Sequence, residues 1–181
     1  MPNYVVKTIV LGEGGIGKTS IIKSFMNEAL SKDYKMTIGV DLFSKTLEYD
    51  NERTVTFSVN DIAGQKRFAE LKNLFIRGTQ ISLLVFDLTR KDTLINLVNN
   101  WIIPLMELCP DTINILIGNK SDLEDLRVID KKEATETLKK LRKSFPSAQF
   151  LDYIETSALR NQNINPTFQL LGKTYLKNLK K

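Results

Sequence analysis

The stretch GEGGIGKTS, residues Gly12 to Ser20, decides the fold. It fits the pattern G-x-x-x-x-G-K-[ST], whose fixed positions are Gly12, Gly17, Lys18 and Thr19. An apolar run at 5–11 precedes it and a helical pattern at 16–26 follows, which is the strand–loop–helix context that the pattern requires. Glycines let successive backbone N–H groups turn toward phosphate oxygens, and the following helix points its positive end at them. We therefore expect a phosphate-binding loop in which Lys18 contacts the terminal phosphates and Thr19 offers its hydroxyl to Mg²⁺. The alternative is a plain flexible turn.

Outward from this loop, apolar runs alternate with helical patterns. Continuous apolar runs at 81–86 and 113–117 are typical of central strands covered on both faces, and alternation at 54–59 predicts a strand with two unlike faces. The other predicted strands are 5–11, 40–49 and 150–154, and the predicted helices are 16–26, 92–108, 130–144 and 164–180. Pro104 is expected to kink or end the second of these helices. The pattern predicts an α/β fold with a mostly parallel six-stranded sheet, helices on both faces and a single domain over residues 1–181.

Composition excludes several kinds of site. The 181 residues include one cysteine, Cys109, and no histidine, which excludes an internal disulfide, a cysteine-based metal cluster and the usual general base. No run approaches the length of a membrane span, and the first ten residues lack the regions of a signal peptide. A cytoplasmic location is the default expectation. The net charge of +5 is compatible with an acidic partner or with solubility alone.

Three further loops follow predicted strands, where ligands of such sheets lie. In DIAGQ, 61–65, an acid can hold a phosphate-bound Mg²⁺, a glycine can bring its N–H to a phosphate, and a glutamine can hold a water. The other two loops are NKSD, 119–122, and ETSA, 155–158. The carboxylate of Asp122 can accept two hydrogen bonds from the N–H edge of guanine, whereas adenine presents an acceptor there. Taken alone, each loop also fits an ordinary turn, and Asp122 fits a helix cap.

The four loops together, in this order, resemble the Ras superfamily of small GTPases over nearly the whole chain. TIGVD, AGQKRF, IRG and VFDLT are most similar to its Rab branch. The resemblance implies a P-loop G-domain fold and a Mg²⁺-dependent switch between GTP and GDP, with slow hydrolysis, acting in membrane traffic or signalling. It also implies a monomer without a nucleic-acid partner, served by an exchange factor, a GTPase-activating protein and effectors that bind two switch loops.

The resemblance assigns roles to individual residues. The catalytic groups would be Gln65, which positions the attacking water, Lys18 and the switch threonine Thr37. The metal ligands would be Thr19, Thr37 and Asp61. The guanine would be held by Asn119, Lys120 and Asp122, with the backbone of Ala158 at its exocyclic oxygen. The remaining nucleotide contacts would be Gly14, Gly15, Ile16, Gly17, Ser20, Leu30, Tyr34, Gly64, Ser157 and Leu159.

Several residues depart from the Rab pattern. The usual Trp-Asp-Thr-Ala-Gly-Gln-Glu of the second switch is altered at Asn60, Ile62 and Lys66, and Leu42 replaces an aromatic residue. No known Rab partner is therefore assumed. Leu30 replaces an aromatic residue that packs on guanine, and Leu159 replaces a basic residue that covers it. The chain ends YLKNLKK without a prenylation cysteine, so we expect a lipidated tail to be absent or trimmed.

Two rival functions are weighed against the switch. Asn60 and Lys66 flank the catalytic segment and are the support for a guanine-nucleotide-binding module with negligible hydrolysis, whereas Gln65 argues for hydrolysis. A P-loop kinase would need a lid with arginines and a substrate pocket; the sequence indicates neither, and Asp122 disfavours ATP. No arginine follows the pattern of an internal finger, which is the reason for expecting slow turnover.

Lysines recur at helical spacing in two places, which are Lys132, Lys139, Lys140 and Lys143, and then Lys173, Lys177, Lys180 and Lys181. Such stripes hold a protein to an anionic membrane surface with about 1 kcal/mol per side chain. A solvated helix face explains the same spacing more simply. Peripheral attachment to the cytosolic face of a membrane therefore stays open beside a purely cytoplasmic location.

Overall fold

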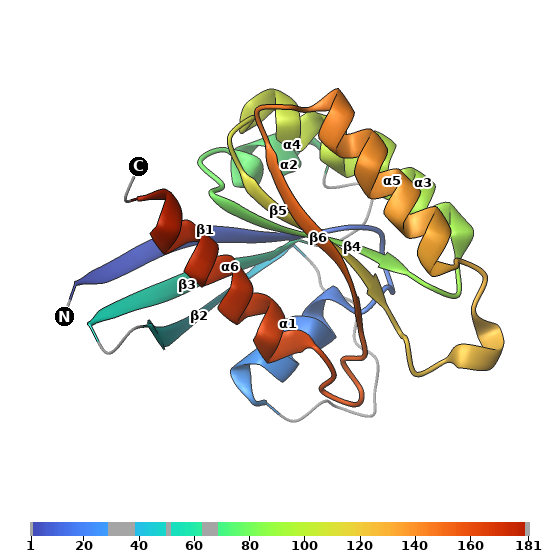
Figure 1. The fold of residues 1–181 in the computed structure, drawn as a ribbon, viewed down its shortest axis with the longest axis horizontal. Helices are drawn as coiled ribbons and strands as arrows, with labels where there is room; N and C mark the ends of the chain where they lie inside the picture. The colour runs from blue at the N-terminus through green and yellow to red at the C-terminus, as the bar shows by residue number, and fades with distance from the viewer. Residues whose placement is uncertain (1, 29–38, 50–51, 63–68, 180–181) are drawn as a thin grey trace.

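The computed structural model describes residues 2–28, 39–49, 52–62 and 69–179. A six-stranded sheet forms its centre, in the order β2-β3-β1-β4-β5-β6 (Figure 1). The strands are β1 Asn3–Leu11, β2 Val40–Tyr49, β3 Arg53–Ile62, β4 Ile81–Asp87, β5 Ile113–Asn119 and β6 Gln149–Thr156. β2 runs antiparallel to β3, and every other neighbouring pair is parallel. The predicted mostly parallel α/β sheet is confirmed.

Five of the six strands extend beyond their predicted bounds, and the extension of β3 bears directly on the site. The expected strand at 54–59 continues to Ile62, so Asp61 lies inside β3 and not in the loop after it. The reason is pairing on both sides, because Asp61 lies opposite Asp41 of β2 and Val10 of β1. The ladder therefore holds the carboxylate at a fixed place beside the first loop.

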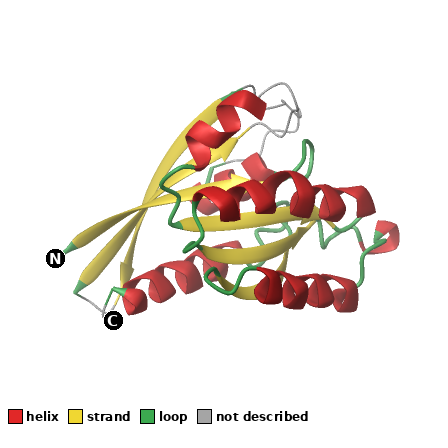
Figure 2. Ribbon diagram, turned by 90° about the horizontal axis from the view of Figure 1, so that it is seen from above, coloured by secondary structure: helices red, strands yellow, loops and turns green. Residues whose placement is uncertain are grey.

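Helices cover both faces of the sheet, as Figure 2 shows from above. They are α1 Lys18–Met26, α2 Ala69–Ile76, α3 Lys91–Leu97, α4 Ile103–Leu108, α5 Lys131–Ser144 and α6 Ile164–Asn178. On one face, Phe25 of α1 and Phe168 of α6 stack with ring centroids 3.6 Å apart. On the other face, Leu97, Trp101 and Leu138 belong to a second buried cluster that joins α3, α4 and α5 to the sheet.

The two lysine stripes lie on different sides of the molecule. Lys132, Lys139, Lys140 and Lys143 are exposed on α5, whereas Lys173 and Lys177 are exposed on α6, and these helices cover opposite faces of the sheet (Figure 1). The stripes therefore do not merge into one basic surface. Lys180 and Lys181 lie outside the described residues. Within the described part of the chain, no helix has the length and apolar character to cross a membrane.

The helix predicted at 92–108 is divided just before Pro104, in agreement with the expected end of its regular part. Residues Val98–Ile102 form a π-helical turn between α3 and α4, in which the Ile103 N–H bonds to the Val98 carbonyl. Pro104 then falls in the first turn of α4, where a helix needs no intrahelical N–H donor. The wider turn thus carries the chain past the proline and leaves Trp101 in the core, with 5% of its surface exposed.

Candidate functional site

The loop between β1 and α1 is closely packed at two of its glycines. Gly12 and Gly17 have φ values of +147° and +95°, which residues with a side chain rarely adopt. A Cβ atom on Gly12 would lie 2.3 Å from the Val85 carbonyl oxygen, and one on Gly17 would lie 2.4 Å from the Asn119 amide nitrogen. These two glycines therefore set how closely the loop approaches β4 and the end of β5.

Lys18 begins α1 and folds back over the loop that precedes it. Its Nζ donates to the carbonyl oxygens of Gly12 at 2.9 Å and Glu13 at 2.7 Å, and only 6% of the residue is exposed. Burial lowers the pKa of Lys18 to about 8, although the carboxylates of Asp61 and Glu13 act in the opposite direction. A poorly hydrated ammonium group next to backbone N–H donors is suited to receive a phosphate.

A hydroxyl and a carboxylate meet beside this loop. Thr19 Oγ1 donates a hydrogen bond to Asp61 Oδ2, and Asp61 is fully buried at the end of β3. These oxygens are of the kind that Mg²⁺ prefers, and Mg²⁺ usually binds through one or two protein groups together with substrate phosphates. Among the described residues, no group of three or more His, Cys, Asp and Glu side chains gathers to hold a metal alone. The donor set therefore fits Mg²⁺ bound together with a phosphate.

Asn119 joins three of the predicted loops. Its Nδ2 donates to the Ile16 carbonyl oxygen at 2.8 Å, and its Oδ1 accepts from Thr156 Oγ1 at 3.0 Å. Asn119 is 2% exposed, so both bonds are buried. In the neighbouring loop, Ser157 Oγ donates to Asp122 Oδ1 at 2.5 Å. Loops that lie more than 100 residues apart in the sequence are thus held as one unit.

The other predicted residues are distributed as follows. Gly14, Gly15 and Ser20 lie in or beside the first loop; Ala158 is buried after β6, and Leu159 is 74% exposed. Lys120 has a left-handed backbone with φ +68°, and its Nζ lies 2.6 Å from Asp87 Oδ2. The predicted residues Leu30, Tyr34, Thr37, Gly64 and Gln65 lie outside the described residues.

The sequence analysis did not identify Asp87 and Arg90, which the structure adds to the site. Asp87 ends β4, is fully buried, and accepts hydrogen bonds from the Thr89 backbone and hydroxyl at Oδ1 and from Arg90 Nε at Oδ2. Burial acts to raise the pKa of Asp87, but the hydrogen bonds from Lys120 and Thr89 outweigh it and hold that pKa below its usual value. The sequence signal that could have identified Asp87 is the position of an acidic residue directly after the apolar run ISLLVF.

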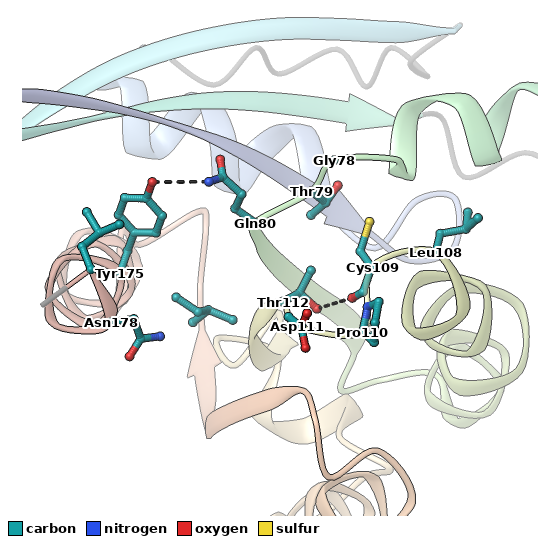
Figure 3. Close-up of a pocket in the computed structure, with 12 residues that line it drawn as sticks. Gly78, Thr79, Gln80, Leu108, Cys109, Pro110, Asp111, Thr112, Tyr175 and Asn178 are labelled. Atoms are coloured by element: carbon teal, nitrogen blue, oxygen red, sulfur yellow. Dashed lines mark hydrogen bonds between the residues drawn. The ribbon is translucent and has the colours of Figure 1, made fainter. Parts of the chain in front are cut away.

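A separate cavity of about 500 Å³ lies far from these loops. It is bounded by the segments before β4 and β5 and by the end of α6, so it opens at the amino ends of the strands. Figure 3 shows Gln80 and Tyr175, joined by a 3.3 Å hydrogen bond, on one side of it and Cys109 on the other. None of the predicted site residues lines this cavity.

The sheet order, the antiparallel edge strand and the glycine loop before α1 define a P-loop α/β protein. Residues 7–177 match a model of the Ras family. The Ypt/Rab-type GTPase ypt7 of Schizosaccharomyces pombe is 35% identical over 180 residues, which cover 97% of this chain and 84% of that protein. The Ras-related protein Rab7 of Cenchrus ciliaris is 35% identical over 181 residues, covering 96% and 84%. The Ras-related protein Rab-11C of Dictyostelium discoideum is 34% identical over 169 residues, covering 93% and 71%. The chain therefore belongs to the Ras family, as a small GTPase similar to its Rab and Ypt members.

Proposed function

We propose that this chain is a molecular switch that binds GTP or GDP with Mg²⁺ at the four loops, hydrolyses GTP slowly and acts in membrane traffic. The observation that carries the proposal is the pair of buried hydrogen bonds that Asn119 makes to the Ile16 carbonyl and the Thr156 hydroxyl. This pair holds the phosphate loop, through the Ile16 carbonyl, against the loops that contain Asp122 and Ser157. One bound molecule with a phosphate end and a base end matches that arrangement.

The phosphate end of the proposed ligand lies at the first loop. The low-pKa ammonium group of Lys18 and the backbone N–H groups of the loop are the donors, and α1 adds the positive end of its dipole. Thr19 and Asp61 supply oxygen ligands for Mg²⁺, which when bound neutralises charge on the phosphates. The family resemblance adds Thr37 as a third ligand, with Gly64 and Gln65 at the γ-phosphate.

The base end lies between the loops after β5 and β6. Asp122 is held by Ser157, which leaves carboxylate capacity to accept from the N–H edge of guanine. Lys120 is fixed by the buried carboxylate of Asp87, so its stem has a defined position. The resemblance adds Ala158, whose backbone would contact the exocyclic oxygen, and Leu159 as an apolar cover. Leu30 and Tyr34 complete the proposed nucleotide contacts.

Hydrolysis in this proposal needs no covalent nucleophile. Gln65 orients a water toward the γ-phosphate, and the donors of the first loop stabilise the charge that develops on the phosphate oxygens. The proposed partners are an exchange factor, a GTPase-activating protein and effectors at the switch loops. The rival binding module without hydrolysis is supported by Asn60 and Lys66; Asn60 is 6% exposed within β3, and Lys66 lies outside the described residues.

A single-turnover assay tests the proposal. The protein is loaded with GTP, Mg²⁺ is added, and free phosphate is followed. We expect one phosphate per chain with a rate constant on the order of 10⁻⁴–10⁻³ per second, the scale of Ras-type enzymes without an activator. GTP that stays bound and intact over a day would favour the binding module. Failure to bind GTP would overturn the proposal altogether.

A further inference from the structure

The phosphate loop contains two adjacent glycines, Gly14 and Gly15. A Cβ atom on Gly14 would have no heavy atom of the described residues within 4 Å, and Gly15 has φ +74°. A peptide group between two glycines has no side chain on either residue to restrict its rotation. In the proposed site the N–H of Gly15 is one of the donors to the phosphates, so the direction of this peptide matters for binding.

Arg90 holds this peptide from outside the loop. Its Nη2 donates to the Gly14 carbonyl oxygen at 3.0 Å, while its Nε lies 3.2 Å from Asp87 Oδ2. The guanidinium group thus uses two of its donors in fixed directions. In a planar trans peptide the C=O and N–H point to opposite sides. A bond that fixes the Gly14 carbonyl therefore also fixes the Gly15 N–H on the side away from Arg90.

The anchor of Arg90 is shared with the base end of the site. Asp87 Oδ2 also lies 2.6 Å from Lys120 Nζ, and Asp87 itself is fully buried, so the carboxylate is a rigid attachment point. Its other oxygen is held by Thr89. One buried carboxylate consequently connects the first loop, through Arg90, with the loop that contains Lys120.

We propose that Arg90 is a positioning residue that holds the Gly14–Gly15 peptide in its phosphate-binding direction and thereby slows nucleotide release. The proposal rests on the proposed function, since it assumes a nucleotide in this site. Arg90 touches the loop backbone and does not act as a catalytic finger. Arg90 changes how long the nucleotide stays bound and not the rate of hydrolysis.

The test is the release rate of a fluorescent GDP analogue, chased with excess GDP, from the parent and two variants. Arg90→Ala should release the analogue about fivefold faster, the factor expected for one partly exposed charge-assisted hydrogen bond. Lys91→Ala is the matched control, because it removes the same charge one residue away. Among the described residues, the Lys91 ammonium pairs with Glu133 on α5 at 3.1 Å and forms no ion pair with the phosphate loop. It should release at the parental rate.

A coupling experiment separates this role from a general structural one. Gly14→Ala restricts the same peptide, and no heavy atom of the described residues lies within 4 Å of the added Cβ. The factor by which Arg90→Ala speeds release should therefore be smaller in the Gly14→Ala background than in the parent. Melting temperatures measured alongside should stay within a few degrees of parent, because the Arg90 side chain is 41% exposed and Asp87 keeps Lys120 and Thr89.

Equal release from Arg90→Ala and the parent would overturn the proposal, as would equal acceleration by Lys91→Ala. An undiminished factor in the Gly14→Ala background would show that Arg90 does not act through this peptide, and would overturn it as well. A parent protein that does not bind the GDP analogue contradicts the proposed function itself. The two failures are therefore distinguishable in one experiment.

Discussion

Replacing Asn119 with alanine removes the two buried hydrogen bonds that join the loops. The Ile16 carbonyl and the Thr156 hydroxyl each lose a buried partner, because Asn119 is 2% exposed and bonds to them at 2.8 and 3.0 Å. A buried polar group left without a partner costs roughly 1–3 kcal/mol. For the two groups we expect a loss of about 3 kcal/mol in the free energy of unfolding, or roughly 6–12 °C in melting temperature for a domain of this size.

Two further variants test whether the loss in the free energy of unfolding comes from the two Asn119 hydrogen bonds. Thr156→Val removes only the hydroxyl partner, so Asn119→Ala should cost about 1 kcal/mol less in that background. Gly17→Ala places a Cβ 2.4 Å from the Asn119 amide nitrogen in the parent. In the Asn119→Ala background that contact is gone and only the strain of φ +95° remains, so the cost of Gly17→Ala should fall.

The assay is urea unfolding followed by far-ultraviolet circular dichroism at several GDP concentrations, extrapolated to zero nucleotide, because Asn119 is also a proposed guanine contact and a changed GDP affinity would itself shift the stability. A loss below about 0.5 kcal/mol for Asn119→Ala would refute the reasoning, since surface substitutions give effects of that size. Strict additivity of Asn119→Ala with both Thr156→Val and Gly17→Ala would refute it too. Either result would mean that Asn119 does not join these loops.

Three further predictions concern the ligand. Asp122→Asn should weaken GTP binding and favour XTP, because the amide offers a donor where guanine also presents one; an unchanged preference in GTP–XTP competition would remove Asp122 from base reading. Gln65→Leu should slow single-turnover hydrolysis and leave GTP affinity nearly unchanged, since the lost group orients water and does not hold the nucleotide; equal hydrolysis rates would contradict this. Leu30→Phe should slow the release of a fluorescent GDP analogue several-fold, as an added aromatic contact is worth ~1 kcal/mol, and equal or faster release would argue against it.

The sheet and its loops could be predicted because their signals are local. The apolar runs at 81–86 and 113–117 are buried strands, and the glycine pattern at 12–19 lies between a strand and a helix, as expected. The helix predicted at 130–144 is α5, Lys131–Ser144, and Asp130 caps it, because its side chain accepts from the Glu133 N–H at 2.7 Å. Each of these outcomes depends on residues close together in the sequence.

The interactions between loops could not be predicted in this way. The Arg90–Gly14 and Asn119–Ile16 bonds join residues 76 and 103 positions apart. Arg90 stands in no motif, and Asp87, although it belongs to VFDLT, was assigned no role. The break expected near Pro104 is present, but its form, a π-helical turn over Val98–Ile102, could not be predicted from the local rule. Trp101 in this turn is buried, and its indole N–H donates to the Glu13 carboxylate of the first loop at 3.4 Å.

The identity of the nucleotide carried by the purified protein tests the central claim most directly. The protein is denatured, and the released nucleotide is separated by chromatography and quantified against protein. The account predicts GDP or GTP, close to one per chain, retained in the presence of Mg²⁺. An adenine nucleotide in its place would contradict it, as would a nucleotide-free protein that fails to bind added GTP with Mg²⁺.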